Sequence, residues 1–231
     1  TSGALSELGA AEEDESQWEL GEEQVHTDRW LLCEVLAAGR TRGLALEPRF
    51  VARGALPYAS VAAHLLRDGA PPEAGCAVGG QLAAPLPLPV VTGLPVHVIG
   101  RFELKAAQRG VQLKTASSHA DEAMRVEWNR ELCASVAVAY HTLLASLPRH
   151  LHRSQPMEAM YAFWPTREAL ALDELDAAIL APLYALAADS SLFLATPREI
   201  EEERAPKRGL RKLEDGFVLQ PGGDKRVEGF V

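Results

Sequence analysis

The middle of the chain carries the clearest periodic pattern of apolar residues. Large apolar side chains recur there at three- and four-residue spacing over about six turns, which is typical of an amphipathic helix. They are Trp128, Leu132, Val136, Tyr140, Leu143, Leu144 and Leu147. The pattern predicts a long helix over residues 121–147, which starts in the capping sequence SSHADE and ends at Pro148. A second helix is predicted over residues 173–188, with a kink at Pro182.

Shorter apolar runs on either side of the long helix predict strands. In LPVHVIGRFEL, Val96, Val98 and Gly100 alternate with the residues between them, so one face of this strand should be buried. The prolines in the preceding residues 85–89 cannot donate ladder hydrogen bonds, which favours an extended connector or a sheet edge. Further strands are predicted in YASVAAHLL, CAVGGQLA and SLFLA.

The two ends of the chain differ from the middle. Residues 1–27 contain the acidic run AEEDESQWELGEEQ, which predicts a disordered or loosely attached segment. Next, RWLLCEV and RGLALE flank the turn sequence AAGRTRG, a pattern that predicts a surface hairpin. Residues 28–198 should form the main domain, followed in residues 199–231 by a charged linker and a hairpin around PGGD. This order of strands, helices and late strands predicts an α/β or α+β fold with a mixed sheet.

Composition narrows the classes of function. With 231 residues, 47% of them hydrophobic, the chain is long enough to bury a core. Its net charge of -9 argues against duplex DNA or an anionic membrane as the main partner, and no apolar run is long enough for a membrane span. The cysteines lack the spacing of a zinc site or a disulfide framework, so we expect a reducing, cytoplasmic location. They are Cys33, Cys76 and Cys133.

The chain offers little chemistry for catalysis. VGG and PGG lack the lysine and hydroxyl of a phosphate loop, so we expect neither an ATP site nor an enzyme in this chain. His150 and His152 form an HxH pair after a helix-ending proline, which favours an exposed basic loop over a metal site. His97 is better explained as a hydrogen-bonded structural residue than as a general base. Glu127 and Glu131 are most simply a solvated helix face.

One group of cations follows the predicted strand at LPVHVIGRFEL. Arg101, Lys105 and Arg109 lie on or just beyond its end, where a loop at the sheet rim could present charge to a phosphate. Simple surface charge is the favoured explanation for them. Arg109 and Lys105 are therefore weak candidates for cofactor binding, and Arg109 is the weak candidate for a catalytic role.

Several segments, in order, carry a resemblance to a known family. LPLPVVTGLPVHVIGRFEL, preceded by ALPYASVAAHL and followed by EWNRELCASVAVAYHTLL and YAFWP, resembles the sacsin family over about residues 30–195. The resemblance implies a fold like the middle region of the ninety-kilodalton heat-shock chaperones, placed after an ATP-binding domain that this chain does not contain. It implies that domain, client proteins and other chaperones as partners, with ATP and magnesium used only by the parent protein.

The resemblance also assigns a role to the loop after the strand. In the family this loop carries two adjacent arginines, and it resembles the chaperone loop whose arginine reaches the terminal phosphate. Here only Arg109 remains of the pair, with Gln108 at the other position, and Ile99 replaces an asparagine of the family motif. The expected function is thus a segment of a sacsin-like chaperone or co-chaperone in protein folding and quality control. The alternative is a structural or protein-interaction module in which the nucleotide function has decayed.

Overall fold

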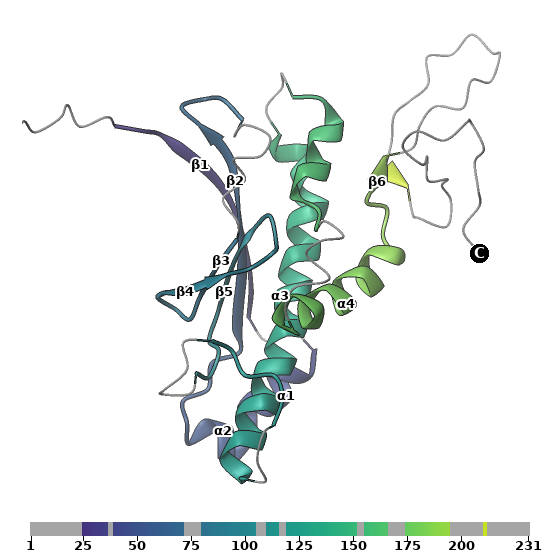
Figure 1. Cartoon of the computed structure of the whole chain (residues 1–231). Coiled ribbons are helices and arrows are strands. Elements are labelled where there is room, and N and C mark those ends of the chain that lie inside the picture. Colours follow the sequence, from purple (N-terminus) through teal and green to yellow (C-terminus); the bar gives the residue numbers. More distant parts are fainter. Residues whose placement is uncertain are drawn as a thin grey trace, which may run out of the picture.

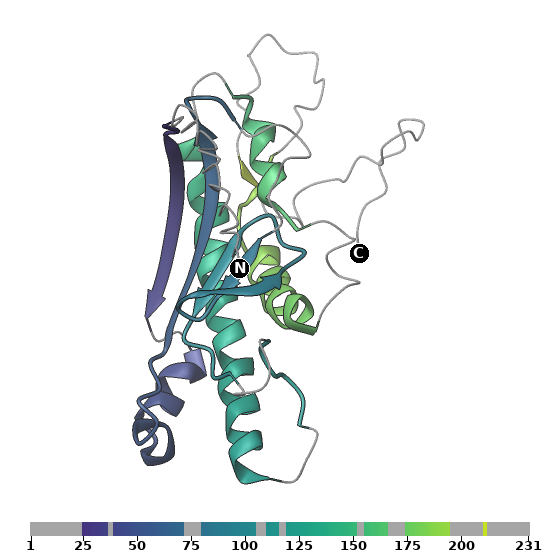
Figure 2. The same cartoon turned by 60° about the vertical axis from the view of Figure 1, so that its left-hand side comes forward.

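The chain has an α/β fold in which a mixed sheet lies against one long helix (Figures 1 and 2). This computed structural model describes residues 25–36, 39–71, 80–104, 110–115, 119–151, 155–165, 174–194 and 210–211. The strands of the five-stranded sheet follow the order β1-β2-β5-β3-β4. Their bounds are β1 Asp28–Leu36, β2 Tyr58–Arg67, β3 Gln81–Ala83, β4 Pro87–Val91 and β5 His97–Gly100.

The sheet is mixed because of one pair of strands. β3 runs parallel to β5, whereas the β1–β2, β2–β5 and β3–β4 pairs are antiparallel. The predicted strands at YASVAAHLL and LPVHVIGRFEL are confirmed as β2 and β5, and Val96 and Val98 are at most 1% exposed. The proline-rich stretch is confirmed as a sheet edge, because Pro87 begins the outermost strand, β4.

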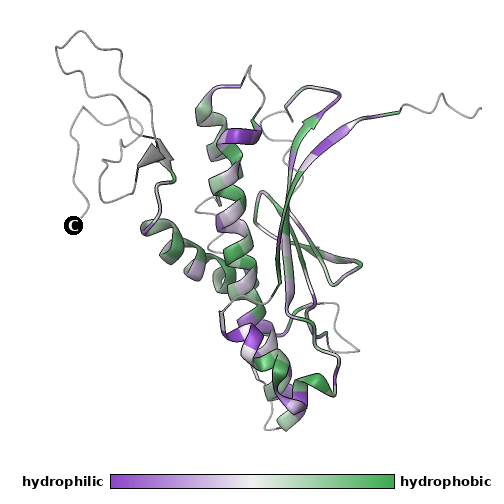
Figure 3. Cartoon of the chain, turned by 180° about the vertical axis from the view of Figure 1, so that it is seen from behind, coloured by the Kyte–Doolittle hydropathy of each residue, from purple (hydrophilic) through white to green (hydrophobic). Residues whose placement is uncertain are grey.

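The helices of the described residues are α1 Gly39–Leu46, α2 Pro48–Val51, α3 Ala120–His150, the 3-10 helix η1 Met157–Phe163 and α4 Glu174–Ala188. Figure 1 shows α3 and α4 on one side of the sheet, and α1 and α2 beyond its lower end. α3 and α4 confirm the two predicted helices, and Pro182 lies inside α4. A second, two-stranded sheet pairs β6 Phe193–Leu194 with β7 Leu210–Arg211. Figure 3 shows that hydrophobic residues dominate the strands and α4.

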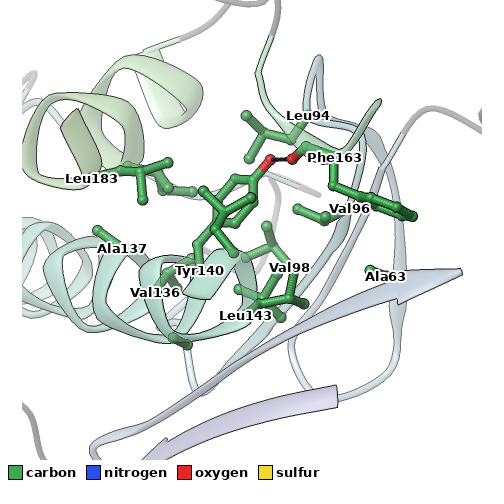
Figure 4. Close-up of a cluster of buried hydrophobic side chains, with 14 of the residues drawn as sticks. Ala63, Leu94, Val96, Val98, Val136, Ala137, Tyr140, Leu143, Phe163 and Leu183 are labelled. Atoms are coloured by element: carbon green, nitrogen blue, oxygen red, sulfur yellow. Dashed lines mark hydrogen bonds between the residues drawn. The ribbon is translucent and has the colours of Figure 1, made fainter. Parts of the chain in front are cut away.

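The core forms where the apolar stripe of α3 meets the sheet (Figure 4). Val136, Tyr140 and Leu143 are fully buried against the inner face that includes Val98. The phenol of Tyr140 donates a hydrogen bond of 2.7 Å to the carbonyl of Phe163, which satisfies the one polar group that the stripe buries here. Burial raises the pKa of Tyr140 well above its usual value, so the phenol keeps its proton.

Trp128 does not pack on the sheet with the rest of the stripe. It is fully buried, but in a separate cluster with Leu44 of α1 and Phe50 of α2. The Trp128 and Phe50 rings lie 5.5 Å apart, between centroids. The N-terminal part of α3 extends past the sheet, so α1 and α2 cover it instead (Figure 2).

The predicted hairpin of RWLLCEV and RGLALE is wrong. β1 pairs with β2, and residues 39–46 form α1. Thr41 and Leu44 share one face of a helix but would point to opposite faces of a strand. Both are buried: the Thr41 hydroxyl donates to the Glu131 carbonyl (2.9 Å) and hydrogen-bonds to Ser135 Oγ (2.8 Å). Packing on α3 therefore overrides the poor helix propensity of this glycine-containing segment.

The ends of α3 also differ from the prediction. Residue 119 is the N-cap and makes no side-chain capping bond, and the helix runs through Pro148 to His150. Pro148 has no N–H to donate to the carbonyl of Leu144, but the helix continues past it, and the Leu151 amide donates to the Leu147 carbonyl (3.0 Å). Most of the acidic segment 1–27 and the expected hairpin around PGGD lie outside the described residues.

Candidate functional site

Asn129 of α3 joins two described stretches of chain, residues 101–104 and 110–113. Its amide oxygen accepts from the backbone N–H of Glu103 (2.9 Å), and its amide nitrogen donates to the carbonyls of Glu103 (2.9 Å) and Gln112 (3.1 Å). Leu104 and Val111 form an isolated antiparallel bridge just beyond these contacts. The segment before residue 105 and the segment after residue 109 are thus tied to each other and to α3.

The residues on either side of Asn129 extend this attachment. Trp128 Nε1 donates to the carbonyl of Arg101 (2.8 Å), and Arg130 Nε donates to the carbonyl of Leu113 (2.7 Å). Consecutive helix residues point about 100° apart, so the three side chains reach different parts of the segment. We call Trp128, Asn129 and Arg130 the helix clamp; it fixes the backbone at both ends of residues 101–113.

The predicted cationic group is only partly described. Arg101 lies just after β5 and is exposed, and its carbonyl is held by the helix clamp. Lys105 and Arg109 lie outside the described residues, between the two ends that the clamp fixes. Arg53 attaches the same region to the rest of the protein, because it pairs with Glu103 (3.1 Å) and Asp121 (2.9 Å).

A shallow pocket of about 290 Å³ lies beside the clamp. Its lining includes Arg130 of the clamp and a short ion-pair network. Arg40 pairs with both Glu127 (3.0 Å) and Glu131 (3.3 Å), and Arg49 also pairs with Glu127 (2.9 Å). The two glutamates are therefore not simply a solvated face, as predicted, but partners of α1 and α2.

The TGLP turn before β5 has a structural role. Thr92 Oγ1 donates to the Gly80 carbonyl (3.0 Å), and the Gly93 amide donates to the buried carboxylate of Asp176 in α4 (2.9 Å). A side chain on Gly80 would place its Cβ 1.9 Å from the Val96 carbonyl oxygen, so this close approach requires glycine. The turn is therefore a junction between the sheet and α4.

Two histidines and a tryptophan gather on the sheet face opposite α3. Trp30 stacks on His64 at 4.6 Å between ring centroids and lies 5.2 Å from His97. His97 Nδ1 accepts from the Gln81 amide (3.1 Å), which confirms the structural role predicted for it. Burial, together with the nearby His64, lowers the pKa of His97, which favours the neutral ring.

Asp28 forms a hydrogen-bonded group with Arg67 and His64 at one end of this cluster. Asp28 pairs with Arg67 through both carboxylate oxygens (2.9 and 3.1 Å) and with His64 (3.0 Å). The hydrogen bonds from Arg67, supported by those of His64, lower the pKa of the Asp28 carboxyl to about 2. These contacts join the start of β1 to the end of β2. The group contains no serine, threonine or cysteine that His64 could activate as a nucleophile.

Other sequence candidates contribute no site in the described part of the chain. His150 ends α3, whereas its HxH partner His152 and also Cys76 lie outside the described residues. No group of three potential metal ligands occurs among the residues that are described. Burial raises the pKa of the Cys133 thiol to about 12, which makes it unreactive. Within the same residues, no helix has both the length and the apolarity needed to cross a membrane.

The sequence prediction missed the most informative residue, Asn129. A signal was present: Asn129 precedes the buried Leu132 and Cys133 by three and four positions, so a helix places it on the apolar side. A polar residue there needs buried partners. No protein-family model, no curated protein and no solved structure matches the chain. These comparisons therefore assign no activity to it.

Proposed function

We propose that this chain is a module of a sacsin-like, cytoplasmic chaperone or co-chaperone in protein folding and quality control. In this proposal it works with an ATP-binding domain that it does not itself contain, and with client proteins or other chaperones. The observation that carries the proposal is the helix clamp: Asn129 bonds to both Glu103 and Gln112 and so anchors both ends of the segment that includes Arg109. Anchoring of this kind suits a loop that must offer one side chain at a set position.

The chemistry assigned to this loop is contact with a terminal phosphate. A guanidinium can grip phosphate oxygens with two parallel hydrogen bonds, and its charge stabilises phosphoryl transfer most when it is held in place. Arg109 takes this role, and Lys105 supplies auxiliary charge without the bidentate geometry. The fixed backbone at residues 101–104 and 110–113 reduces the entropy lost when the arginine engages its target.

The nucleotide itself should be bound elsewhere. We expect the isolated chain to show no saturable heat when titrated with ATP and magnesium at about 100 μM protein, a concentration that detects weak binding. A saturable signal would mean that the chain has its own nucleotide site. The proposal that the nucleotide binds only to a separate ATP-binding domain would then be wrong.

The decisive test uses the protein that includes the ATP-binding domain. Arg109→Ala should slow ATP turnover about tenfold or more while ATP affinity changes little, because the arginine acts on the phosphate in the transition state. Asn129→Ala should slow turnover too, since it releases both ends of the loop. Arg101→Ala is the matched control: it removes an exposed arginine of the same segment that precedes the loop. Equal turnover in wild type and Arg109→Ala would refute the phosphate contact.

A second function has a specific observation in its favour. Trp30, Leu32 and Leu36 are 44%, 49% and 68% exposed on β1, on the sheet face opposite α3. A row of exposed apolar side chains on a strand is typical of a protein-interaction surface. If turnover proves independent of Arg109, the interaction module with decayed nucleotide function becomes the preferred assignment.

A further inference from the structure

The two edges of the sheet are built differently. At one edge, Pro87 and Pro89 of β4 lack the N–H groups that another strand would need, and such prolines prevent edge-to-edge pairing. At the other edge, β1 is nine residues long and contains no proline. Figures 1 and 2 show β1 at the outer end of the sheet. The edge formed by β1 can therefore accept a further strand.

β1 presents apolar side chains on both of its faces. Trp30, Leu32 and Leu36 are the exposed large apolar residues of the outer face. Leu31, Cys33 and Val35 alternate with them and are only partly buried against the core. A strand added beside β1 would cover both rows at once. The backbone of β1 is regular from Trp30 onward, because its one irregularity in pairing with β2 lies between Arg29 and Trp30.

We propose that β1 pairs antiparallel with β1 of a second copy of this chain, about a two-fold axis at Cys33. A two-fold axis makes the interface self-complementary, so one residue lies opposite itself and the others pair symmetrically. Centring on Cys33 brings Trp30 opposite Leu36 and Leu31 opposite Val35. The paired stretch is then residues 30–36, which is the regular part of the strand.

The charges on β1 select this register. Centring on Leu31 would set Asp28 opposite Glu34, and centring on Glu34 would set that residue opposite itself; like charges directly opposite are destabilising. Centring on Leu32 would place Asp28, Arg29 and Glu34 opposite apolar residues. Of the registers centred on Leu31, Leu32 and Cys33, only the one at Cys33 leaves Asp28 and Arg29 outside the paired stretch. Glu34 then lies opposite Leu32 and keeps the hydrogen bond that it accepts from Tyr58 (2.6 Å).

The first test measures molar mass. The chain should sediment with a mass that rises with concentration from 25.0 kDa toward twice that value. Leu32→Lys, which adds a charge to the edge, should shift the chain to monomer. Leu86→Lys is the matched control, because Leu86 is 75% exposed but lies next to the proline-bearing edge, and it should leave the dimer intact. A monomer at all concentrations up to about 100 μM would overturn the proposal.

The second test asks whether Cys33 lies opposite Cys33 of the second copy. It does not depend on whether Leu32→Lys folds. In a Cys76→Ser background, diamide should join two copies through Cys33, each thiol losing one proton and one electron as diamide is reduced to its hydrazine. Cys133 is fully buried and should not react. Cys33→Ser should abolish the cross-linked dimer. A dimer that does not cross-link through Cys33, or that survives Leu32→Lys in a folded chain, would show that another surface joins the copies. This interface does not depend on the proposed chaperone function, since neither test involves nucleotide.

Discussion

Replacing Asn129 by alanine should destabilise the protein more than its small change in volume suggests. The side chain is fully buried and makes three hydrogen bonds to backbone groups of Glu103 and Gln112. A buried hydrogen bond contributes about 0.5–1.5 kcal/mol net, so the loss of three should lower the free energy of unfolding by about 3 kcal/mol. The urea concentration at the midpoint of unfolding should fall. The dependence of the unfolding free energy on urea should stay unchanged, because the substitution does not alter the surface area that unfolding exposes.

Two further variants separate hydrogen bonding from packing at Asn129. Asn129→Asp has nearly the same shape but replaces both donated hydrogen bonds with an acceptor facing two carbonyls, so it should be at least as destabilising as alanine. Thr142→Ala is the control: its exposed hydroxyl donates to the Val138 carbonyl of the same helix, and its loss should change the free energy of unfolding by less than about 0.5 kcal/mol. If Asn129→Ala also lies within about 0.5 kcal/mol of wild type, the helix clamp does not hold the segment.

Three other variants test the core, the turn and the open sheet face. Trp128→Ala should lower the free energy of unfolding, measured in urea, by about 3–5 kcal/mol. A decrease below about 0.5 kcal/mol would mean that this ring does not pack in the core. Gly80→Ala should lower Tm, since its Cβ would come 1.9 Å from a backbone oxygen, whereas Gly43→Ala, with open space around it, should not. Burial lowers the pKa of His97 below 6.5, so stability should be retained above pH 6.5 and fall at lower pH. If the stability of His97→Gln falls just as steeply below pH 6.5, other groups cause the pH dependence.

Local periodicity explains which parts of the fold could be predicted from the sequence. The stripe containing Val136 and Tyr140 and the alternation of Val96 and Val98 each repeat within one element, and burial followed both patterns. α1 could not be found in this way. It is short and contains glycine, and it is helical because Thr41 bonds to α3, about ninety positions later in the chain.

The site was harder to predict because its contacts join distant segments. Asp176 meets the Gly93 amide across 83 positions, and nothing near either residue indicates the other. Asn129 gave a usable signal through its helical position, but its partners could not be named from spacing alone. The roles of Lys105 and Arg109 stay predictions, because they derive from the family resemblance and both residues lie outside the described part of the chain.

The central position of β2 has a consequence for how the chain folds. Ala62 pairs with Leu32 on one side and with His97 on the other, so β2 cannot be completed by a local hairpin. Closing such distant contacts costs chain entropy before burial compensates for it, which slows folding relative to a helical bundle. During synthesis, the flank of β2 that meets β5 stays unpaired until residue 100 has been made, and its inner face stays uncovered until α3 follows. That interval is when the nascent chain is most exposed to aggregation.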